Sequence, residues 1–526
     1  MYFVVIMAFA LVLSDDLPPR QLNLFAGRPL GDAVVLWGTI SWAVVQIVLV
    51  ALVSWLFRRR TIAALDGTVA GQDTAGRRYS RGQFIQLAIL AIFLILTLVC
   101  TPWARIVRQP DGWNLDRIPL VGDLMLLAPF FASLTIAWIV QYAAEHRLKS
   151  MTLSASAGQD DLSAGESGKG GSPDARAALT AARRSSESPE SSLGSYLLDK
   201  FRHQVLIIAA PMVLIVLAKH FTDQARPSLF RTTGLPWVSD AILGAASIAV
   251  LVLAPVMLRY IWATEPLPPG PLRERFESTC RRIGLRYREI LLWHTHGMTV
   301  NAAVMGFIPP LRYILVSDAL LETLSEEEIE AVFAHEAGHV HHWHLPFFGA
   351  FAATSMYLSG GVVMLLDHTN IVRDYGLLQL AGLCLLLAIW LFGFGWLSRR
   401  FERQADLFGV RCITPDVSGC LSWCPVHGER RSAGLCVSAA NIFGRTLCKI
   451  ASLNGIPRKA PSWRHGSIES RCRLIEHLTA EPHALTGFDR SLVRVKAALA
   501  VATLIGTIGA AVIYYDGIAK ALGWRA

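Results

Sequence analysis

Long apolar stretches constrain the fold of this chain more than any other feature of its sequence. A helix that crosses a bilayer needs about 20 mainly apolar residues, and the backbone must satisfy its own hydrogen bonds there. Charged residues make up only 17% of the 526 positions, against about 25% in soluble globular proteins. We therefore predict a multi-pass integral membrane protein, with spans near 33–57, 84–102, 119–143, 203–220, 239–262, 345–366, 376–397 and 494–514.

The distribution of basic residues predicts the orientation of these spans. Loops 58–82 and 146–201 are richer in Lys and Arg than 103–118 and 221–238, which places the first two loops in the cytoplasm. Counting spans then places 263–344 and 398–493 on the cytoplasmic side as well. The net charge of +9 is explained by these flanking arginines, so we expect no nucleic-acid partner.

The expected organisation alternates membrane and soluble segments, and the fold class is mainly α. We predict a multi-span helical bundle with a soluble cytoplasmic domain that contains a small β-sheet. Residues 1–13 are interpreted as a short or partial membrane segment, with a cleaved signal peptide as the minor alternative. The Ser- and Gly-rich stretch 151–195 has few large apolar residues and is predicted to be disordered. The predicted segments are 1–150 (N-terminal spans), 151–195 (disordered cytoplasmic loop), 196–264 (two further spans), 265–344 (first part of the soluble domain), 345–397 (membrane helical hairpin), 398–491 (second part of the soluble domain) and 492–526 (C-terminal span).

The run His335-Glu336-Ala337-Gly338-His339 carries the clearest chemical signal. Residues four apart share one face of a helix, so both imidazoles can bind one metal ion. Glu336 projects beside them and can act as general base on a metal-activated water. Ser325 and Glu328 have capping-box spacing, which predicts a helix over about 326–343.

Two histidines do not complete a catalytic zinc site, which needs a third protein ligand. Glu402 is a candidate, with Asp406 four residues later on the same helix face, where it can orient a ligand histidine. Two predicted spans lie between His339 and Glu402, so the chain returns to the same side of the membrane. A solvated carboxylate balanced by nearby arginines is the alternative interpretation of Glu402.

These pieces together resemble the M48 family of membrane zinc metallopeptidases, which includes the CAAX-processing Ste24 proteases and the bacterial HtpX proteases. The resemblance covers about 265–480. It rests on Asn301-Ala302-Ala303, Val316-Ser317-Asp318-x-Leu320, Glu327-Glu328-Ile329, HEAGH at 335–339, Glu402-x3-Asp406, and His465-Gly466-Ser467 with Arg471. Gly466 stands where the family has proline.

The resemblance implies that the cytoplasmic domain is a catalytic domain of the zincin type (gluzincin), with 265–344 as its first part and 398–491 as its second. It also implies roles for individual residues. His335, His339 and Glu402 would bind one Zn²⁺ per chain, and Glu336 would be the general base. His465 and Arg471 would stabilise the oxyanion of the tetrahedral intermediate or hold the site together. Asn301, Ala302 and Ala303 would form an edge on which an extended substrate pairs.

A second group of metal-binding residue types lies further along the chain. Cys420, Cys424 and His427 have loose metal-ligand spacing, and Cys436 follows nearby. They form either a second metal site or a set of reduced thiols in a cytoplasmic loop.

The function favoured by the sequence is an integral-membrane zinc endopeptidase that acts on peptide or membrane-protein substrates. Its expected location is a lipid bilayer, a bacterial inner membrane, with the site at the cytoplasmic face. Quality control of membrane proteins and processing of lipidated C-termini remain open. The alternatives are a zincin-type membrane sensor or signalling protein and a non-catalytic membrane scaffold.

Overall fold

The computed structural model describes most of the chain, and its contacts divide the chain into two units. The described residues are 29–30, 32–66, 68–163, 192–295, 300–367, 376–413, 420, 424, 426, 434–454 and 456–521. One unit consists of 1–169 and 185–262, and the other of 170–184 and 263–526. The predicted segment 1–13 and His427 lie outside the described residues.

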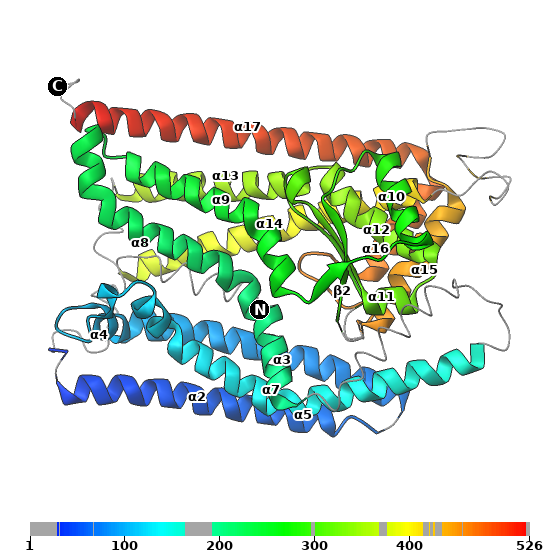
Figure 1. The fold of residues 1–526 in the computed structure, drawn as a ribbon, viewed down its shortest axis with the longest axis horizontal. Helices are drawn as coiled ribbons and strands as arrows, with labels where there is room; N and C mark the ends of the chain where they lie inside the picture. Colours follow the sequence, from blue (N-terminus) through cyan, green and yellow to red (C-terminus); the bar gives the residue numbers. More distant parts are fainter. Residues whose placement is uncertain are drawn as a thin grey trace. The chain divides into compact units, whose positions relative to one another are not determined.

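The first unit is helical throughout its described secondary structure (Figure 1). Its elements are α2 (Ala33–Ile62), α3 (Val69–Cys100), α4 (Trp103–Arg108), η1 (Leu115–Arg117), α5 (Val121–Ser163), α7 (Leu193–Lys200), η2 (Phe201–Leu206), α8 (Ile207–Thr233) and α9 (Val238–Ile261). Helix α5 extends into the segment predicted to be disordered, so 151–163 are helical, whereas 164–191 are not described.

Buried polar side chains join the helices of this unit. Gln46 of α2 donates to the hydroxyl of Ser133 on α5 at 3.1 Å and accepts from Thr97 of α3 at 3.0 Å. Further along α5, Glu145 accepts hydrogen bonds from Tyr79 and Tyr196. Because hydrogen bonds are directional and apolar contacts are not, such pairs fix the register of otherwise apolar helices.

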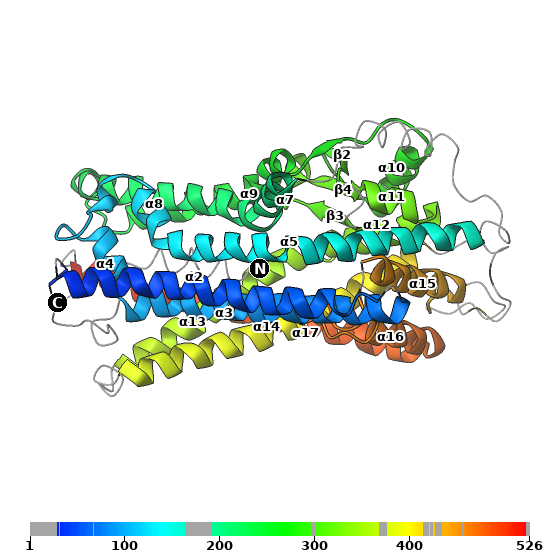
Figure 2. The same cartoon turned by 90° about the horizontal axis from the view of Figure 1, so that it is seen from below.

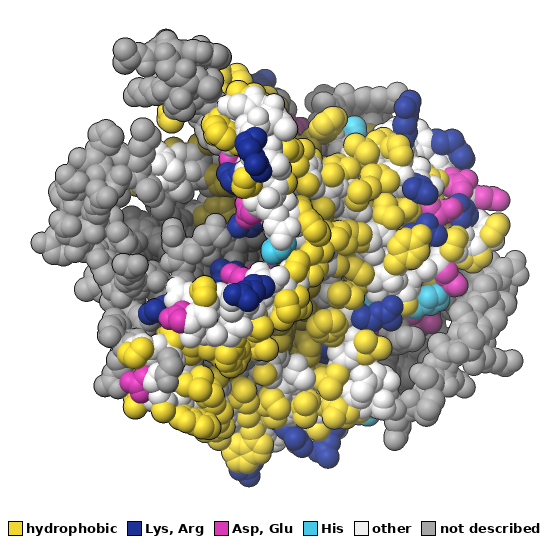
Figure 3. Space-filling view, turned by 60° about the vertical axis from the view of Figure 1, so that its left-hand side comes forward, with side chains coloured by type: hydrophobic (Ala, Val, Ile, Leu, Met, Phe, Trp, Pro, Cys, Tyr) yellow, Lys and Arg dark blue, Asp and Glu magenta, His cyan; other side chains and the backbone are white. Residues whose placement is uncertain are grey.

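The described helices confirm an integral membrane protein. Six are long and apolar enough to cross a bilayer: Ala33–Ile62, Thr74–Leu98, Val121–Leu148, Leu193–Thr233, Val238–Ile261 and Pro482–Ile513. Large apolar side chains such as Ile248 and Ile505 are exposed, and hydrophobic side chains cover much of the surface in Figure 3. Exposed apolar surface on helices of this length is typical of segments that contact lipid. The two remaining predicted spans coincide with α13 (His344–Asp367) and the first part of α14 (Gly376–Cys412).

The second unit contains the small sheet that was predicted, together with eight described helices. The strands are β1 (Thr264–Pro266), β2 (Glu289–Trp293), β3 (Ala302–Met305) and β4 (Tyr313–Ser317), in the order β1-β2-β4-β3. Strands β2 and β4 are parallel, whereas β1 and β3 pair antiparallel at the two edges. Strand β4 is buried throughout and β2 is buried except at Glu289, as their runs of Ile, Leu and Val predict.

The helices of the second unit pack against this sheet and against one another. They are α10 (Pro271–Ile283), α11 (Asp318–Thr323), α12 (Glu326–His341), α13, α14, α15 (Val437–Leu453), α16 (Ile468–Ala480) and α17 (Pro482–Ala521). A short turn, η3 (Pro309–Leu311), precedes β4. Helices α13, α14 and α17 run side by side in both ribbon views (Figures 1 and 2). The mainly α fold with a small sheet is therefore confirmed.

Helix α12 lies unusually close to α14 at one glycine. A Cβ atom on Gly338 would sit 3.1 Å from Cδ1 of Phe408 and 3.2 Å from Cα of Ala405. The second of these is a backbone atom, which can yield only if the helix moves. The absence of a side chain at Gly338 therefore sets how closely the histidine-bearing helix approaches the helix that carries Glu402.

We predict that Gly338→Ala destabilises the protein by about 1–3 kcal/mol, because overpacking at a close helix crossing outweighs the gain in helix propensity. Gly444→Ala in α15 is the matched control, since a Cβ there would meet open space. Thermal unfolding in detergent should show a lower midpoint for the first variant and an equal or higher one for the second. Equal shifts of the two midpoints would contradict the proposed close approach.

Candidate metal centre

Helix α12, which carries the HEAGH run, begins at a well-formed cap. The hydroxyl of Ser325 accepts from the backbone N–H of Glu328, and the Glu328 carboxylate accepts from the backbone N–H of Ser325. This reciprocal pair satisfies two of the amide groups that a helix start leaves without partners. The predicted start is confirmed, and the helix ends at His341, two residues earlier than predicted.

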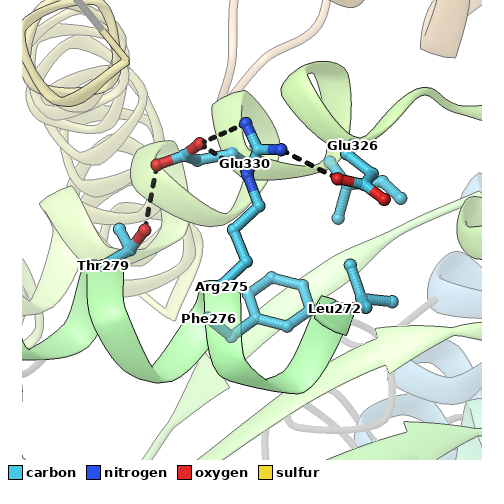
Figure 4. A pocket seen from close by; sticks show the side chains of 7 residues that line it. Leu272, Arg275, Phe276, Thr279, Glu326 and Glu330 are labelled. Atoms are coloured by element: carbon cyan, nitrogen blue, oxygen red, sulfur yellow. Dashed lines mark hydrogen bonds and ion pairs between the residues drawn. The ribbon is translucent and has the colours of Figure 1, made fainter. Parts of the chain in front are cut away.

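Side chains of α10 hold the first half of α12 in place. Glu330 of α12 accepts hydrogen bonds from Thr279, Arg275 and Arg282, and Arg275 also pairs with Glu326 (Figure 4). A partly buried carboxylate with several donors is more strongly held than an isolated surface pair. These contacts fix the axial position of the helix one turn before the metal-binding residues.

The two histidines of α12 point to one place, as their spacing predicts. The Nε2 atoms of His335 and His339 lie 3.4 Å apart. The ring of Phe443 on α15 lies beside His335, with 6.2 Å between ring centroids. Both histidines are largely removed from solvent, so their rings are held in a fixed orientation.

Glu402 of α14 completes a set of three converging donors. Its two carboxylate oxygens each lie 3.6 Å from one Nε2 atom, Oε2 from His335 and Oε1 from His339. A tetrahedral zinc site with bonds of about 2.0–2.1 Å has ligand atoms about 3.3–3.4 Å apart. The three donors thus fit a Zn²⁺ ion with little adjustment, and they leave a fourth position open.

Asp406, one turn after Glu402, lies against the other nitrogen of His335. Its Oδ1 atom is 3.0 Å from Nδ1 of His335. The guanidinium of Arg471 on α16 binds both oxygens of the same carboxylate and lies 3.9 Å from Glu402. All three side chains are buried, so this arrangement joins α12, α14 and α16 by charge in a region of low dielectric constant.

The ionisation of these groups follows from their surroundings. Burial raises the pKa of Asp406, but the Arg471 guanidinium outweighs this and holds it below its usual range. Burial also raises the pKa of Glu402, but His335 and His465 lower it strongly. Burial lowers the pKa of His339 to about 3, so its imidazole is neutral and keeps a lone pair for a metal.

Glu336 and His465 lie close to this group. Glu336 is partly buried, and burial raises its pKa to about 7. His465 is half-exposed, and its Nδ1 atom lies 2.9 Å from Oε2 of Glu402. Gly466 adopts a positive φ of 76° beside it, which suits glycine and excludes the proline found in the resembling family.

A further histidine, His344, lies beside the site without belonging to any of the motifs above. It is buried, and its Nδ1 atom lies 2.9 Å from Nδ1 of His339. Its Nε2 atom lies 2.9 Å from Oε1 of Gln404. When Nε2 of His339 is the ligand atom, its Nδ1–H donates to His344, whose Nε2–H donates to Gln404. The left-handed backbone of Trp343, with φ 59°, turns the chain back toward the helix, and no sequence pattern predicts this turn.

The segment Asn301-Ala302-Ala303 leads into β3, at the edge of the sheet. Among the residues that the structure describes, β3 pairs only with β4. Ser317 donates its backbone N–H to the carbonyl of Asn301, which makes this a hydrogen-bonded pair of the antiparallel ladder. Because such pairs alternate, Ala302 and Val304 direct their backbone groups to the unpaired edge. The strand also contacts α12.

Comparison with known proteins confirms the resemblance to the M48 peptidases. Residues 266–419 match the model of Peptidase family M48. The CAAX prenyl protease 1 homologues of Arabidopsis thaliana and Oryza sativa subsp. japonica are 28% identical over 185 residues and 25% identical over 192 residues. These matches cover 32% and 33% of this chain and 44% and 45% of the relatives, so the chain matches less than half of their length. A crystal structure of S. mikatae Ste24p, 15% identical, gives a TM-score of 0.44 and covers 85% of this chain and 100% of that chain.

The matched segment contains only part of the candidate site. It includes HEAGH, Glu402 and Asp406, whereas His465 and Arg471 lie beyond it. The placement of the last two beside the carboxylates of Glu402 and Asp406 is therefore an observation of the structure alone.

We predict that Arg471→Ala lowers the free energy of unfolding by about 3–5 kcal/mol, because it leaves the buried carboxylate of Asp406 without its counter-ion. Arg473→Ala is a control on the same helix. The side chain of Arg473 is 73% exposed and pairs with Glu469, whereas that of Arg471 is 8% exposed. The control should cost about 0.5 kcal/mol. Denaturant unfolding in detergent measures both, and similar losses for the two variants would contradict a structural role for Arg471.

Proposed function

We propose that this protein is an integral-membrane zinc-dependent endopeptidase whose site faces the cytoplasm. The observation that carries the proposal is the convergence of His335, His339 and Glu402, with Glu336 on the same helix. The match of 266–419 to Peptidase family M48 supports the same reaction class.

His335, His339 and Glu402 would hold the Zn²⁺ ion. When bound, zinc polarises a peptide carbonyl and lowers the pKa of a water molecule to the neutral range. The chain's own residues supply the rest of the chemistry, which consists of proton transfer, charge stabilisation and positioning of the substrate.

Glu336 would be the general base and then the general acid. A carboxylate with a pKa near 7 can take a proton from the attacking water and return it to the leaving amine at neutral pH. Its position next to His335 on a capped helix gives it a fixed distance from the ligand histidines.

The remaining polar residues would divide into one oxyanion donor and several positioning groups. Arg471 uses its guanidinium to bind Asp406, and Asp406 in turn faces His335, which suits positioning. The ring of His465 lies 2.9 Å from Oε2 of Glu402 but is half-exposed, so it is the better placed to donate to an oxyanion.

The unpaired edge of β3 would bind substrate as an added strand. Backbone groups of Ala302 and Val304 face this edge, and the strand contacts the helix that bears HEAGH. Pairing through the backbone needs an extended peptide but no particular side chains. The CAAX prenyl protease 1 homologues suggest processing of prenylated C-termini as one substrate class, with quality control of membrane proteins as the other.

We predict that Glu402→Ala and Glu336→Gln separate metal binding from proton transfer. Detergent-purified wild type should contain about one zinc ion per chain that is bound through Glu402. The Glu402→Ala variant should lack this ion and should no longer cleave casein. Glu336→Gln should keep the zinc and lose about 10²–10⁴-fold in rate, since only the base is removed. Elemental analysis and proteolysis are measured on the same samples.

Two outcomes would contradict this assignment. Zinc retained at full occupancy in Glu402→Ala would mean that another residue is the third ligand. No activity in zinc-loaded wild type, on casein or on a prenylated peptide, would favour the scaffold interpretation.

We predict that Val304→Pro raises KM for extended peptides about fivefold, which is the loss of one backbone hydrogen bond worth about 1 kcal/mol. Val304→Ala is the matched control, because it shortens the side chain and keeps the N–H. Zinc content should be unchanged in both variants. If Val304→Pro and Val304→Ala give the same KM, the substrate does not pair with this edge.

A further inference from the structure

Three cysteines of the second unit bring their sulfur atoms together at the start of α15. The Sγ atoms of Cys420, Cys424 and Cys436 all lie within 4.8 Å of one another. Cys424 and Cys436 are each 1% exposed, whereas Cys420 is partly exposed. The cluster therefore faces the protein interior on one side and is accessible from the other.

The spacing of the sulfurs suits a shared cation better than a covalent bond or apolar packing. Sγ of Cys420 lies 3.4 Å from Sγ of Cys436, whereas a disulfide measures about 2.05 Å. Thiolates around tetrahedral Zn²⁺, with Zn–S bonds of about 2.3 Å, lie about 3.8 Å apart. Apolar packing alone does not require three sulfur atoms to lie within 4.8 Å of one another.

Two neighbouring features favour negatively charged sulfur here. Ser438 directs its hydroxyl as a donor to Sγ of Cys420, at 3.7 Å. Cys436 is the N-cap residue of α15, a helix of 17 residues, so its sulfur lies at the end where the helix dipole and unpaired amides are positive. Metal-binding thiolates are commonly held by hydrogen bonds of this kind.

We infer that Cys420, Cys424 and Cys436 bind a structural Zn²⁺ ion that is separate from the metal centre at His335, His339 and Glu402. Three thiolates leave one tetrahedral position, which a water molecule or a further side chain fills. Since the site contains no histidine or carboxylate among these three ligands, its metal can be distinguished spectroscopically from the other one.

The place of the cluster in the fold gives the ion a role. It ties Cys420 and Cys424, which follow α14 in the chain, to Cys436 at the N-cap of α15. Cys424 and Cys436 belong to the same buried core as Leu407 of α14 and Phe443 of α15. Phe443 contacts His335. A metal ion bound at the start of α15 would therefore restrain Phe443 and, through it, the ring of His335.

The test uses the full-length, detergent-purified protein loaded with Zn²⁺ or Co²⁺. Wild type should bind two metal equivalents, and Cys424→Ser and Cys436→Ser should bind one. Cys448→Ser is the matched control, because Cys448 also lies beside another sulfur, that of Cys472 at 3.9 Å, but in a pair rather than a group of three. It should keep both equivalents.

The cobalt form identifies which site is lost. Sulfur-to-cobalt charge-transfer absorption should appear in wild type and in Glu402→Ala, and should disappear in Cys424→Ser. Failure of the catalytic proposal would leave this absorption unchanged, so the two proposals are tested independently. If the serine variants do not fold, titrating wild type with a mercurial thiol reagent should release one zinc equivalent to a metal-sensitive dye.

Two results would overturn the inference. One is wild-type protein with a single metal equivalent and no sulfur-to-cobalt absorption. The other is a Cys420–Cys436 disulfide, found by mass spectrometry of alkylated protein, in cells that keep the other thiols reduced.

Discussion

The contact of Asp406 with both His335 and Arg471 is the interaction on which the rest of the site depends. It joins α12, α14 and α16 through one buried carboxylate. Asp406 lies one turn from Glu402, so whatever orients Asp406 also sets the position of that donor. An ionised carboxylate can remain buried only beside a cation, and Arg471 supplies it permanently. The positions of the three candidate metal ligands are thus maintained by the ion pair of Asp406 and Arg471, neither of which is itself a candidate ligand.

The membrane-spanning helices and the helix that carries HEAGH could be predicted from the sequence, for physical reasons. Apolar runs predict spanning helices because lipid allows little else, and the capping box of Ser325 predicted where α12 begins. His335 and His339 follow from the helical repeat. Glu402 could be proposed from the sequence because two spans return the chain to the same side of the membrane. Only the structure shows that its carboxylate oxygens lie 3.6 Å from Nε2 of His335 and of His339.

Other features depend on contacts that no local pattern encodes. His344 reaches His339 only because Trp343 adopts a left-handed conformation, which its residue type does not predict. The approach of α12 to α14 at Gly338 is a property of two distant segments. The extent of α5 beyond 150 differed from the expectation because composition predicts whether a segment can bury surface, and gives no precise boundary for a helix.

Among the described residues, β3 has an unpaired edge, and if the protein is the endopeptidase proposed above, this edge has a consequence for its substrates. An edge that offers only backbone groups distinguishes extended chain from folded chain and is nearly indifferent to sequence. A membrane-embedded helix has its own amides internally paired, so it must unwind before it can add to this strand, and the cost rises with each turn. Whether a target is cleaved would then depend on the free energy needed to unwind it. Frayed termini, loops and damaged helices would be cut, and intact helices would be spared.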